Sequence, residues 1–183
     1  MAVNLSGNSI SSPGFVKALH GLLERHAEIR HLMMFEITES ARIGDLQSVN
    51  DVVRGLRQAG HKVCLDDFGA GASAFHYLRA LDVDVVKIDG IYVRDAVTSD
   101  KGAAFLKAMA SLCNDLGIEV VAEMVEDEAS VAFLRQCGVT YGQGYLFGRP
   151  SARIADFDKL GVAPASNRPK RFSPSPNAAG ARS

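Results

Sequence analysis

Oxygen-donor side chains follow several strand-like apolar runs in this sequence, always at the end of the run. They are Asn4, Glu36, Asp66, Asp67 and Glu123, with Lys87 in the same position after another run. A charged group at the end of a buried strand is costly unless it is paired or ligated. The carboxyl ends of parallel strands meet at one face of a βα-barrel. We therefore expect these side chains to form one site at that face.

The donor set predicts a site for hard divalent cations. Carboxylate and amide oxygens suit Mg²⁺, Mn²⁺ or Ca²⁺ better than zinc, and the adjacent carboxylates of Asp66 and Asp67 repel each other unless a cation lies between them. Four or five carboxylates carry enough charge for two ions about 3.5–4 Å apart, which activate a bridging water and hold a phosphodiester for in-line attack. Lys87 would then stabilise developing negative charge or position the water, and Asp89 could hold Lys87.

Taken one at a time, these residues have simpler structural interpretations. An isolated Asp-Asp pair is more often a helix cap or a solvated turn. Glu39 and Glu126, each three residues after a candidate ligand, could be acids that open a helix, and Gln143 between two glycines could be a turn residue. The five histidines lack ligand spacing and are interpreted as surface or packing residues.

Short apolar runs alternate six times with stretches of helical period. The expected strands are 2–6, 32–37, 62–66, 84–88, 118–123 and 141–147. The expected helices begin at Pro13, with an apolar stripe from Phe15 to Leu23, and then cover 46–59, 74–81, 102–116, 127–137 and 152–160. This alternation predicts an α/β fold, a TIM-like (βα) barrel with about six parallel strands. A closed barrel has eight strands, so we expect the barrel to be incomplete, with its first strands before Met1.

Composition divides the chain into a domain over residues 1–160 and a tail over 161–183. The body carries 16 Lys and Arg against all 21 acidic residues, a formal charge of −5, while the tail is basic and rich in proline and is expected to be disordered. The overall charge of −1 does not favour nucleic acid. Three cysteines without a spacing pattern argue against disulfides or zinc. No apolar stretch is long enough to span a membrane, and a cytoplasmic location is expected.

The candidate residues lie in longer strings that resemble, in order, the motifs of EAL domains. The strings are NLSG (4–7), FEITES (35–40), LDDFGAG (65–71), VKID (86–89), VAEMVE (121–126) and YGQGYLFGRP (141–150). EAL domains are bacterial phosphodiesterases that open cyclic di-GMP to linear pGpG. The resemblance covers about residues 2–160, and six ordered motifs are far more specific than any one of them.

The resemblance implies a role for each matching residue. It implies metal ligands at Asn4, Glu36, Asp66, Asp67 and Glu123. It implies that Lys87 contacts the catalytic water, that Glu123 is a general base or a further ligand, and that Gln143 lies near water and substrate. It implies that Glu39 holds the loop after Asp67, and Glu126 falls where the second glutamate of the same family motif lies. Together with Asp89, which could hold Lys87, these are the candidate positioning residues. The cofactor would be Mg²⁺ or Mn²⁺, with Ca²⁺ inhibitory, and the partners would be cyclic di-GMP and a second copy or a larger signalling protein.

Three departures from the family pattern qualify this expectation. The Glu-Ala-Leu motif with its phosphate-binding arginine, which should precede Asn4, is absent, so we expect weak or no hydrolysis by this chain alone. Ala70 and Ala72 replace the usual threonine and tyrosine, and Met124 stands where glycine is usual. The alternatives are a non-catalytic module that binds cyclic di-GMP or another protein in bacterial signalling, and a fragment of a larger signalling protein that associates through its exposed strand edges.

Overall fold

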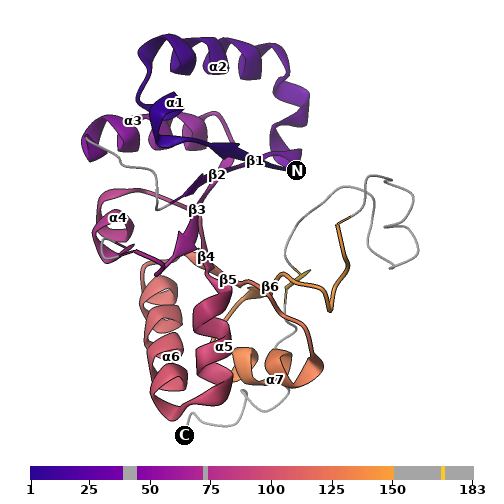
Figure 1. Cartoon of the computed structure of the whole chain (residues 1–183). Helices are drawn as coiled ribbons and strands as arrows, with labels where there is room; N and C mark the ends of the chain where they lie inside the picture. The colour runs from indigo at the N-terminus through magenta and orange to yellow at the C-terminus, as the bar shows by residue number, and fades with distance from the viewer. Residues whose placement is uncertain (39–44, 72–73, 151–169, 172–183) are drawn as a thin grey trace, which may run out of the picture.

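The computed structural model describes residues 1–38, 45–71, 74–150 and 170–171, and one curved sheet runs through it (Figure 1). Its strands, in spatial order, are β1 (Ala2–Leu5), β2 (Met34–Thr38), β3 (Lys62–Phe68), β4 (Val85–Ile88), β5 (Glu119–Ala122), β6 (Tyr141–Gly142) and β7 (Lys170–Arg171). The first six pair as parallel neighbours, which confirms the predicted α/β sheet. Within the described ranges, β1 and β7 end the sheet and the barrel is not closed.

The structure differs from the predicted strands at two places, β6 and β7. β6 is two residues long and not a strand over 141–147, because the chain turns at Gly144 and bonds back to itself between Phe147 and Gly144. β7 was not predicted, and it pairs antiparallel with β6 inside the segment that was expected to be disordered. The rest of that segment lies outside the described residues, so the division into a domain and a tail stays a prediction.

Helices connect the parallel strands and lie along the outer side of the sheet (Figure 1). They are α1 (Gly7–Ile10), α2 (Pro13–Arg25), η1 (Ala27–Leu32), α3 (Leu46–Gln58), α4 (Ala74–Ala80), α5 (Gly90–Thr98), α6 (Asp100–Asp115) and α7 (Glu128–Gln136). Five of the six predicted helices are confirmed, and the sixth, 152–160, lies outside the described residues. α1, η1 and α5 were not predicted. In α5 the β-branched residues Ile91, Val93 and Val97 masked the helical pattern.

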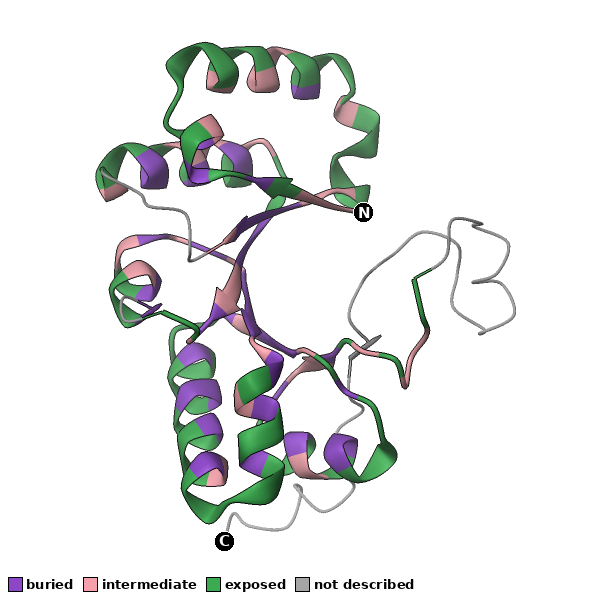
Figure 2. Cartoon of the chain, viewed as in Figure 1, coloured by how far each residue is buried: buried purple, intermediate pink, exposed green. Residues whose placement is uncertain are grey.

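Side chains alternate between the two faces of the sheet, as strand geometry requires. Outward-facing residues such as Phe35, Ile37 and Leu65 are fully buried against the helices and form the main core (Figure 2). The inward-facing residues Cys64 and Val85 form, with Val121, a separate small cluster. The polar site residues continue this inner row toward the carboxyl ends of the strands.

The expected apolar stripe of α2 is mostly not buried. Only Leu23 of this helix is buried, whereas Phe15 is 39% and Leu22 is 47% exposed. The reason is position, because α2 lies at the outer end of the described structure (Figure 1), where it contacts the short elements α1 and η1 and leaves much of its remaining surface open.

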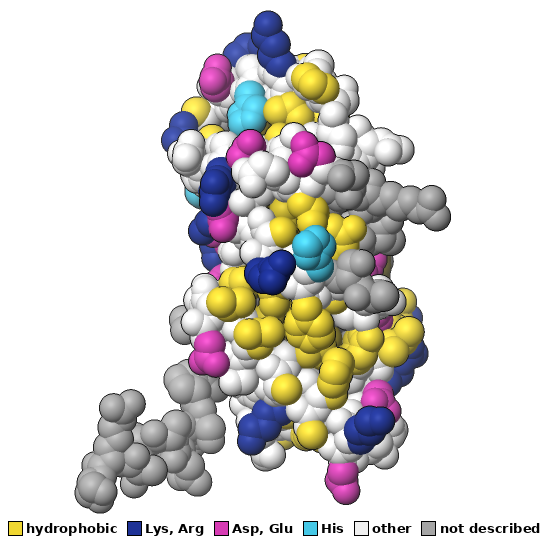
Figure 3. All heavy atoms as spheres, turned by 90° about the vertical axis from the view of Figure 1, so that its left-hand side faces the viewer, with side chains coloured by type: hydrophobic (Ala, Val, Ile, Leu, Met, Phe, Trp, Pro, Cys, Tyr) yellow, Lys and Arg dark blue, Asp and Glu magenta, His cyan; other side chains and the backbone are white. Residues whose placement is uncertain are grey.

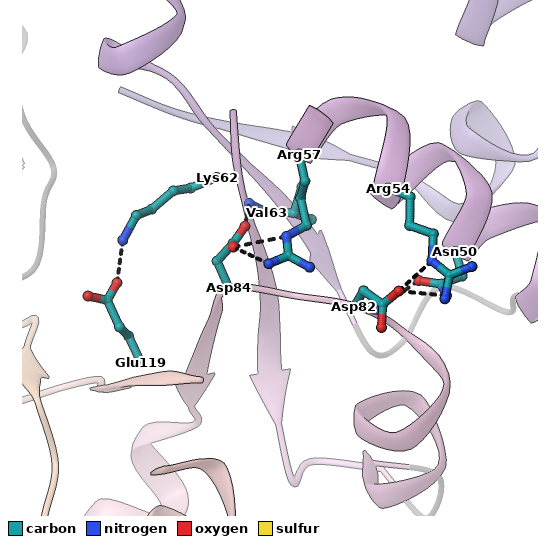
Figure 4. A network of polar contacts seen from close by, with 8 residues as sticks. All are labelled: Asn50, Arg54, Arg57, Lys62, Val63, Asp82, Asp84 and Glu119. Carbon is teal, nitrogen blue, oxygen red and sulfur yellow. Dashed lines mark hydrogen bonds and ion pairs between the residues drawn. The ribbon is translucent and has the colours of Figure 1, made fainter. Parts of the chain in front are cut away.

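Ion pairs join the opposite, N-terminal ends of the strands (Figure 4). Lys62, which begins β3, pairs with Glu119, which begins β5, and so spans β4. Arg57 of α3 lies 2.9 Å from Asp84, whose other oxygen accepts a hydrogen bond from the amide of Val63. Paired charges therefore stabilise this end of the sheet.

No helix among the described residues combines the length and the apolar character that crossing a bilayer would require.

Candidate metal centre

The strand register brings the predicted residues to one place on the inner face. Glu36, Cys64 and Val85 are aligned across β2, β3 and β4. Asp66 and Lys87 each lie two residues further along their strands, so both face inward beyond the apolar cluster. The register therefore brings Glu36, Asp66 and Lys87 to the same face of the sheet.

Lys87 is the hub of this group. Its Nζ lies 2.7 Å from Asp66 Oδ1, 2.7 Å from Glu123 Oε1 and 3.6 Å from Glu36 Oε1. The Lys87 side chain is only 7% exposed, and those of its three partners are between 10% and 18% exposed. The ammonium group of Lys87 thus faces three carboxylates in a position that is largely buried from water.

A β-bulge explains how two adjacent aspartates serve one centre. The pairing of β3 with β4 shifts between Leu65 and Phe68, so that Asp66 and Asp67 together lie opposite Lys87. Asp67 has a left-handed backbone with φ of 56°, which turns its side chain away from the regular alternation. Its amide donates to Asp66 Oδ1 at 3.1 Å. The prediction that the backbone turns here, so that both side chains reach one centre, is confirmed.

Three carboxylates lie close enough together to hold one divalent cation. One oxygen each from Asp66, Asp67 and Glu123 lies within 4.8 Å of the other two. All three are hard oxygen donors, and Glu36 lies beside them on the same inner face. The residues present therefore fit a hard divalent cation.

Four acids, Glu36, Asp66, Asp67 and Glu123, surround a single lysine in this cluster. Burial raises the pKa of Glu36 and of Glu123, which the nearby ammonium of Lys87 only partly offsets. Burial also raises the pKa of Asp67, and the neighbouring carboxylates of Asp66 and Asp89 add to this effect. Burial alone would lower the pKa of Lys87, but its hydrogen bonds to Asp66 and Glu123 raise it above its usual value. A bound cation would relieve the repulsion among these acids.

Backbone hydrogen bonds join the segment after β5 to the segment after β6. The amide of Val125 donates to the carbonyl of Gln143 at 3.0 Å, and the amide of Gln143 donates to the carbonyl of Ala122 at 2.9 Å. A Cβ on Gly144 would lie 2.8 Å from the carbonyl carbon of Val125, so only glycine allows this approach. These contacts set the backbone of Gln143 beside that of Glu123, and Gln143 is exposed.

Other predicted site residues occupy different positions. Asn4 is in register with Glu36 but is exposed on β1. The hypothesis that Asp89 holds Lys87 was wrong, because Asp89 caps α5 and accepts from the amide of Ile91 at 2.8 Å. Glu126 is exposed, and Asp127 rather than Glu126 caps α7. Glu39 lies outside the described residues.

Two neighbours of the site were missed by sequence reasoning. Thr38 pairs in register with Asp66. The hydroxyl of Tyr92 in α5 donates to the carbonyl of Gly69, just after the aspartate pair, and its ring stacks on Phe105 with 5.7 Å between centroids. Tyr92 has no sequence signal of its own, because its contact arises only when α5 packs against the loop. The position of Thr38 depends on the register between β2 and β3.

Comparison with known proteins decides the family. The sequence model of the EAL domain family matches residues 1–150 of this chain. The chain belongs to the EAL domain family. It is 38% identical over 150 residues to cyclic di-GMP phosphodiesterase PdeB of Shewanella oneidensis, an alignment that covers 82% of this chain and 18% of PdeB. The chain thus spans about a fifth of that relative's length.

Solved structures of EAL domains share this fold. An EAL domain protein of Listeria monocytogenes matches with a TM-score of 0.80 and 33% identity, over 87% of this chain and 64% of that one. Klebsiella pneumoniae BlrP1, in a complex with manganese and cyclic di-GMP, matches with a TM-score of 0.71 and 36% identity, over 81% of this chain and 38% of that one. Such neighbours support the TIM-like barrel predicted for this EAL chain.

Proposed function

We propose that this chain is an EAL-type phosphodiesterase domain that binds cyclic di-GMP and directs its hydrolysis to pGpG with Mg²⁺ or Mn²⁺. The observation that carries the proposal is the inward-facing cluster of Asp66, Asp67 and Glu123 around Lys87, at the carboxyl ends of parallel strands. Family membership supports it, and so do the named activity of PdeB and the manganese and cyclic di-GMP of the BlrP1 complex.

In this proposal Asp66, Asp67 and Glu123 hold the metal, with Glu36 beside them and Asn4 at the edge. The metal, when bound, supplies an activated water and neutralises charge on the phosphodiester. Lys87 keeps Asp66 and Glu123 in place and presents a permanent positive charge to the attacking oxygen or the phosphate. Gln143, which is exposed and whose backbone is held beside that of Glu123, would orient water or substrate.

Glu123 has the features of a general base as well as of a ligand. Its pKa is raised mainly by burial, which makes it a better proton acceptor than an exposed glutamate. Its Oε1 lies 2.7 Å from Lys87, so a proton taken up by Glu123 would weaken that ion pair. The roles of base and ligand for this residue stay a proposal, as do positioning roles for Glu126 and Glu39.

Hydrolysis of cyclic di-GMP by the purified chain tests the proposal. The assay follows pGpG formation with Mg²⁺ or Mn²⁺, beside an Asp66→Ala control and with Ca²⁺ as the expected inhibitor. Formation of pGpG above the Asp66→Ala control supports hydrolysis by this chain. Turnover equal to that of the control rules out hydrolysis by this chain and leaves binding to be measured separately.

A non-catalytic module that binds cyclic di-GMP is the second candidate. It is favoured by the open sheet, because β1 has a hydrogen-bonded neighbour on one side only within the described residues. Calorimetry separates the two candidates, since this module would bind cyclic di-GMP without forming pGpG. An absence of both binding and turnover would contradict both.

A homodimer, or docking within a larger signalling protein, is also proposed. Apolar side chains gather in the middle of the face formed by α4 and α6 (Figure 3), where Phe75 is 48%, Leu112 39% and Leu116 56% exposed. They line a groove of about 710 Å³ together with Leu78. Sedimentation of the wild-type chain and of Leu116→Glu tests this, because a dimer through this face would dissociate in the variant. A cytoplasmic location stays a prediction from the sequence.

A further inference from the structure

Met124, the residue after Glu123, adopts a backbone conformation that a side chain disfavours. Its φ is 55°, in the left-handed region, and within the described residues the only other non-glycine residue with a positive φ is Asp67. A residue with a Cβ occupies this region at a cost that glycine does not bear. The side chain of Met124 is also 45% exposed, so burial in a core does not account for its conformation.

Hydrogen bonds on both sides fix the backbone around Met124. The amide of Glu123 donates to the carbonyl of Ile88 at 3.2 Å, which ties it to the end of β4. The amide of Val125 donates to the carbonyl of Gln143 at 3.0 Å, which ties it to the end of β6. Met124 is therefore the residue at which the chain turns between the two neighbouring strand ends.

The Met124 side chain lies directly on the backbone of Gly90. A Cβ placed on Gly90 would be 2.7 Å from Cβ of Met124 and still closer to its Cγ and Sδ, distances that real Cβ atoms essentially never show. Gly90 is buried and opens α5, immediately after Asp89. Its φ lies outside the left-handed region, so the space taken by Met124 is what requires glycine here.

We propose that Met124 is a positioning residue for the metal centre and that it acts through its contact with Gly90. The side chain braces the end of β5 against the start of α5, and this brace fixes the direction in which Glu123 presents its carboxylate to Asp66 and Asp67. The inference rests on the proposed metal site. The proposed role falls on Met124 and Gly90, two residues in contact with each other that bind neither metal nor substrate.

The test compares Mn²⁺ affinity with thermal stability in the full chain. Calorimetry with Mn²⁺ and thermal unfolding in EDTA are run on the wild type, M124G, M124L, G90A and the double variant G90A/M124G. Loss of the brace in M124G should weaken Mn²⁺ binding roughly 10-fold, as removal of groups that support metal ligands typically does. The Tm of M124G should not fall, because glycine is unstrained at this φ. M124L fills the same space and should bind Mn²⁺ within about twofold of the wild type.

The G90A variants identify the contact through which Met124 acts. The methyl group that Gly90→Ala adds should displace the Met124 side chain and weaken Mn²⁺ binding by a similar factor, roughly 10-fold. In the M124G background the clash is gone, so the same substitution should change the affinity less than about twofold. If G90A alone proves too unstable to measure, the comparison of M124G with M124L still decides.

Different results overturn different claims. Equal Mn²⁺ affinity in the wild type and M124G would overturn the positioning role while leaving the metal site intact. An equal effect of Gly90→Ala in both backgrounds would overturn the contact with Gly90 as its physical basis. No Mn²⁺ binding by the wild type would overturn the proposed metal site and this inference with it.

Discussion

Replacing Lys87 by methionine tests the electrostatic reasoning most sharply. The ammonium faces carboxylates at 2.7, 2.7 and 3.6 Å, and its side chain is 7% exposed. Removing one partner of a buried ion pair typically costs about 3–5 kcal/mol, because the opposite charge is left uncompensated. We expect Lys87→Met to lose free energy of unfolding in this range when EDTA keeps the protein free of metal.

The same substitution should make the protein more responsive to metal. Without Lys87, the acids of the cluster have no cation, so Mn²⁺ should bind more tightly than in the wild type. At an Mn²⁺ concentration of about 100 times Kd, binding adds roughly 2.7 kcal/mol of stability, so much of the loss should be recovered. Urea unfolding with EDTA and then with Mn²⁺ measures both effects.

Lys62→Met is the matched control. Lys62 also pairs with a glutamate, Glu119, but its side chain is 56% exposed at the other end of the strands. An exposed ion pair is typically worth about 0–1 kcal/mol. Mn²⁺ should stabilise Lys62→Met as much as the wild type, so the small difference between them should stay the same with and without Mn²⁺. If Lys87→Met unfolded in EDTA at the same urea concentration as Lys62→Met, the account of a buried, surplus-negative cluster would be refuted.

Three further predictions address single contacts. Asp66→Asn should weaken Mn²⁺ binding at least roughly 10-fold by calorimetry without unfolding the chain, and unchanged affinity would remove Asp66 from the ligand set. Burial raises the pKa of Glu36 above 4.5, so the metal-free native state binds more protons than the unfolded state above that pH and loses stability as pH rises. The Tm of Glu36→Gln relative to the wild type should therefore increase between about pH 4.5 and 7 in EDTA, and a flat or falling difference would contradict the burial effect. Tyr92→Phe removes the hydroxyl that donates to Gly69, so it should cost about 1 kcal/mol in urea unfolding and also weaken Mn²⁺ binding, whereas a loss of stability with unchanged affinity would show that the bond does not serve the centre.

The position of the site followed from the sequence because it depends on strand ends. Glu36, Asp66, Lys87 and Glu123 each follow an apolar run, and parallel pairing necessarily brings such ends to one face. The helices that end at Gly60, Gly117 and Gly138 followed for a similar local reason, since a glycine with positive φ closes each of them.

Features that depend on contacts distant in sequence were not predicted. The capping role of Asp89 was missed because α5 was not recognised, and its β-branched residues hid the helical period. The exposure of Phe15 in α2 depends on how many neighbours the sheet supplies, which no local pattern records. Similarly, the departure at Met124 was visible in the sequence, but its contact with Gly90 appears only when β5 and α5 are placed side by side.

Anomalous diffraction from crystals grown with Mn²⁺ tests the central claim most directly. The account predicts a manganese peak within bonding distance of carboxylate oxygens of Asp66, Asp67 and Glu123. A map with no peak between these three residues, or with manganese bound only near Asp84 at the other end of the strands, would contradict it.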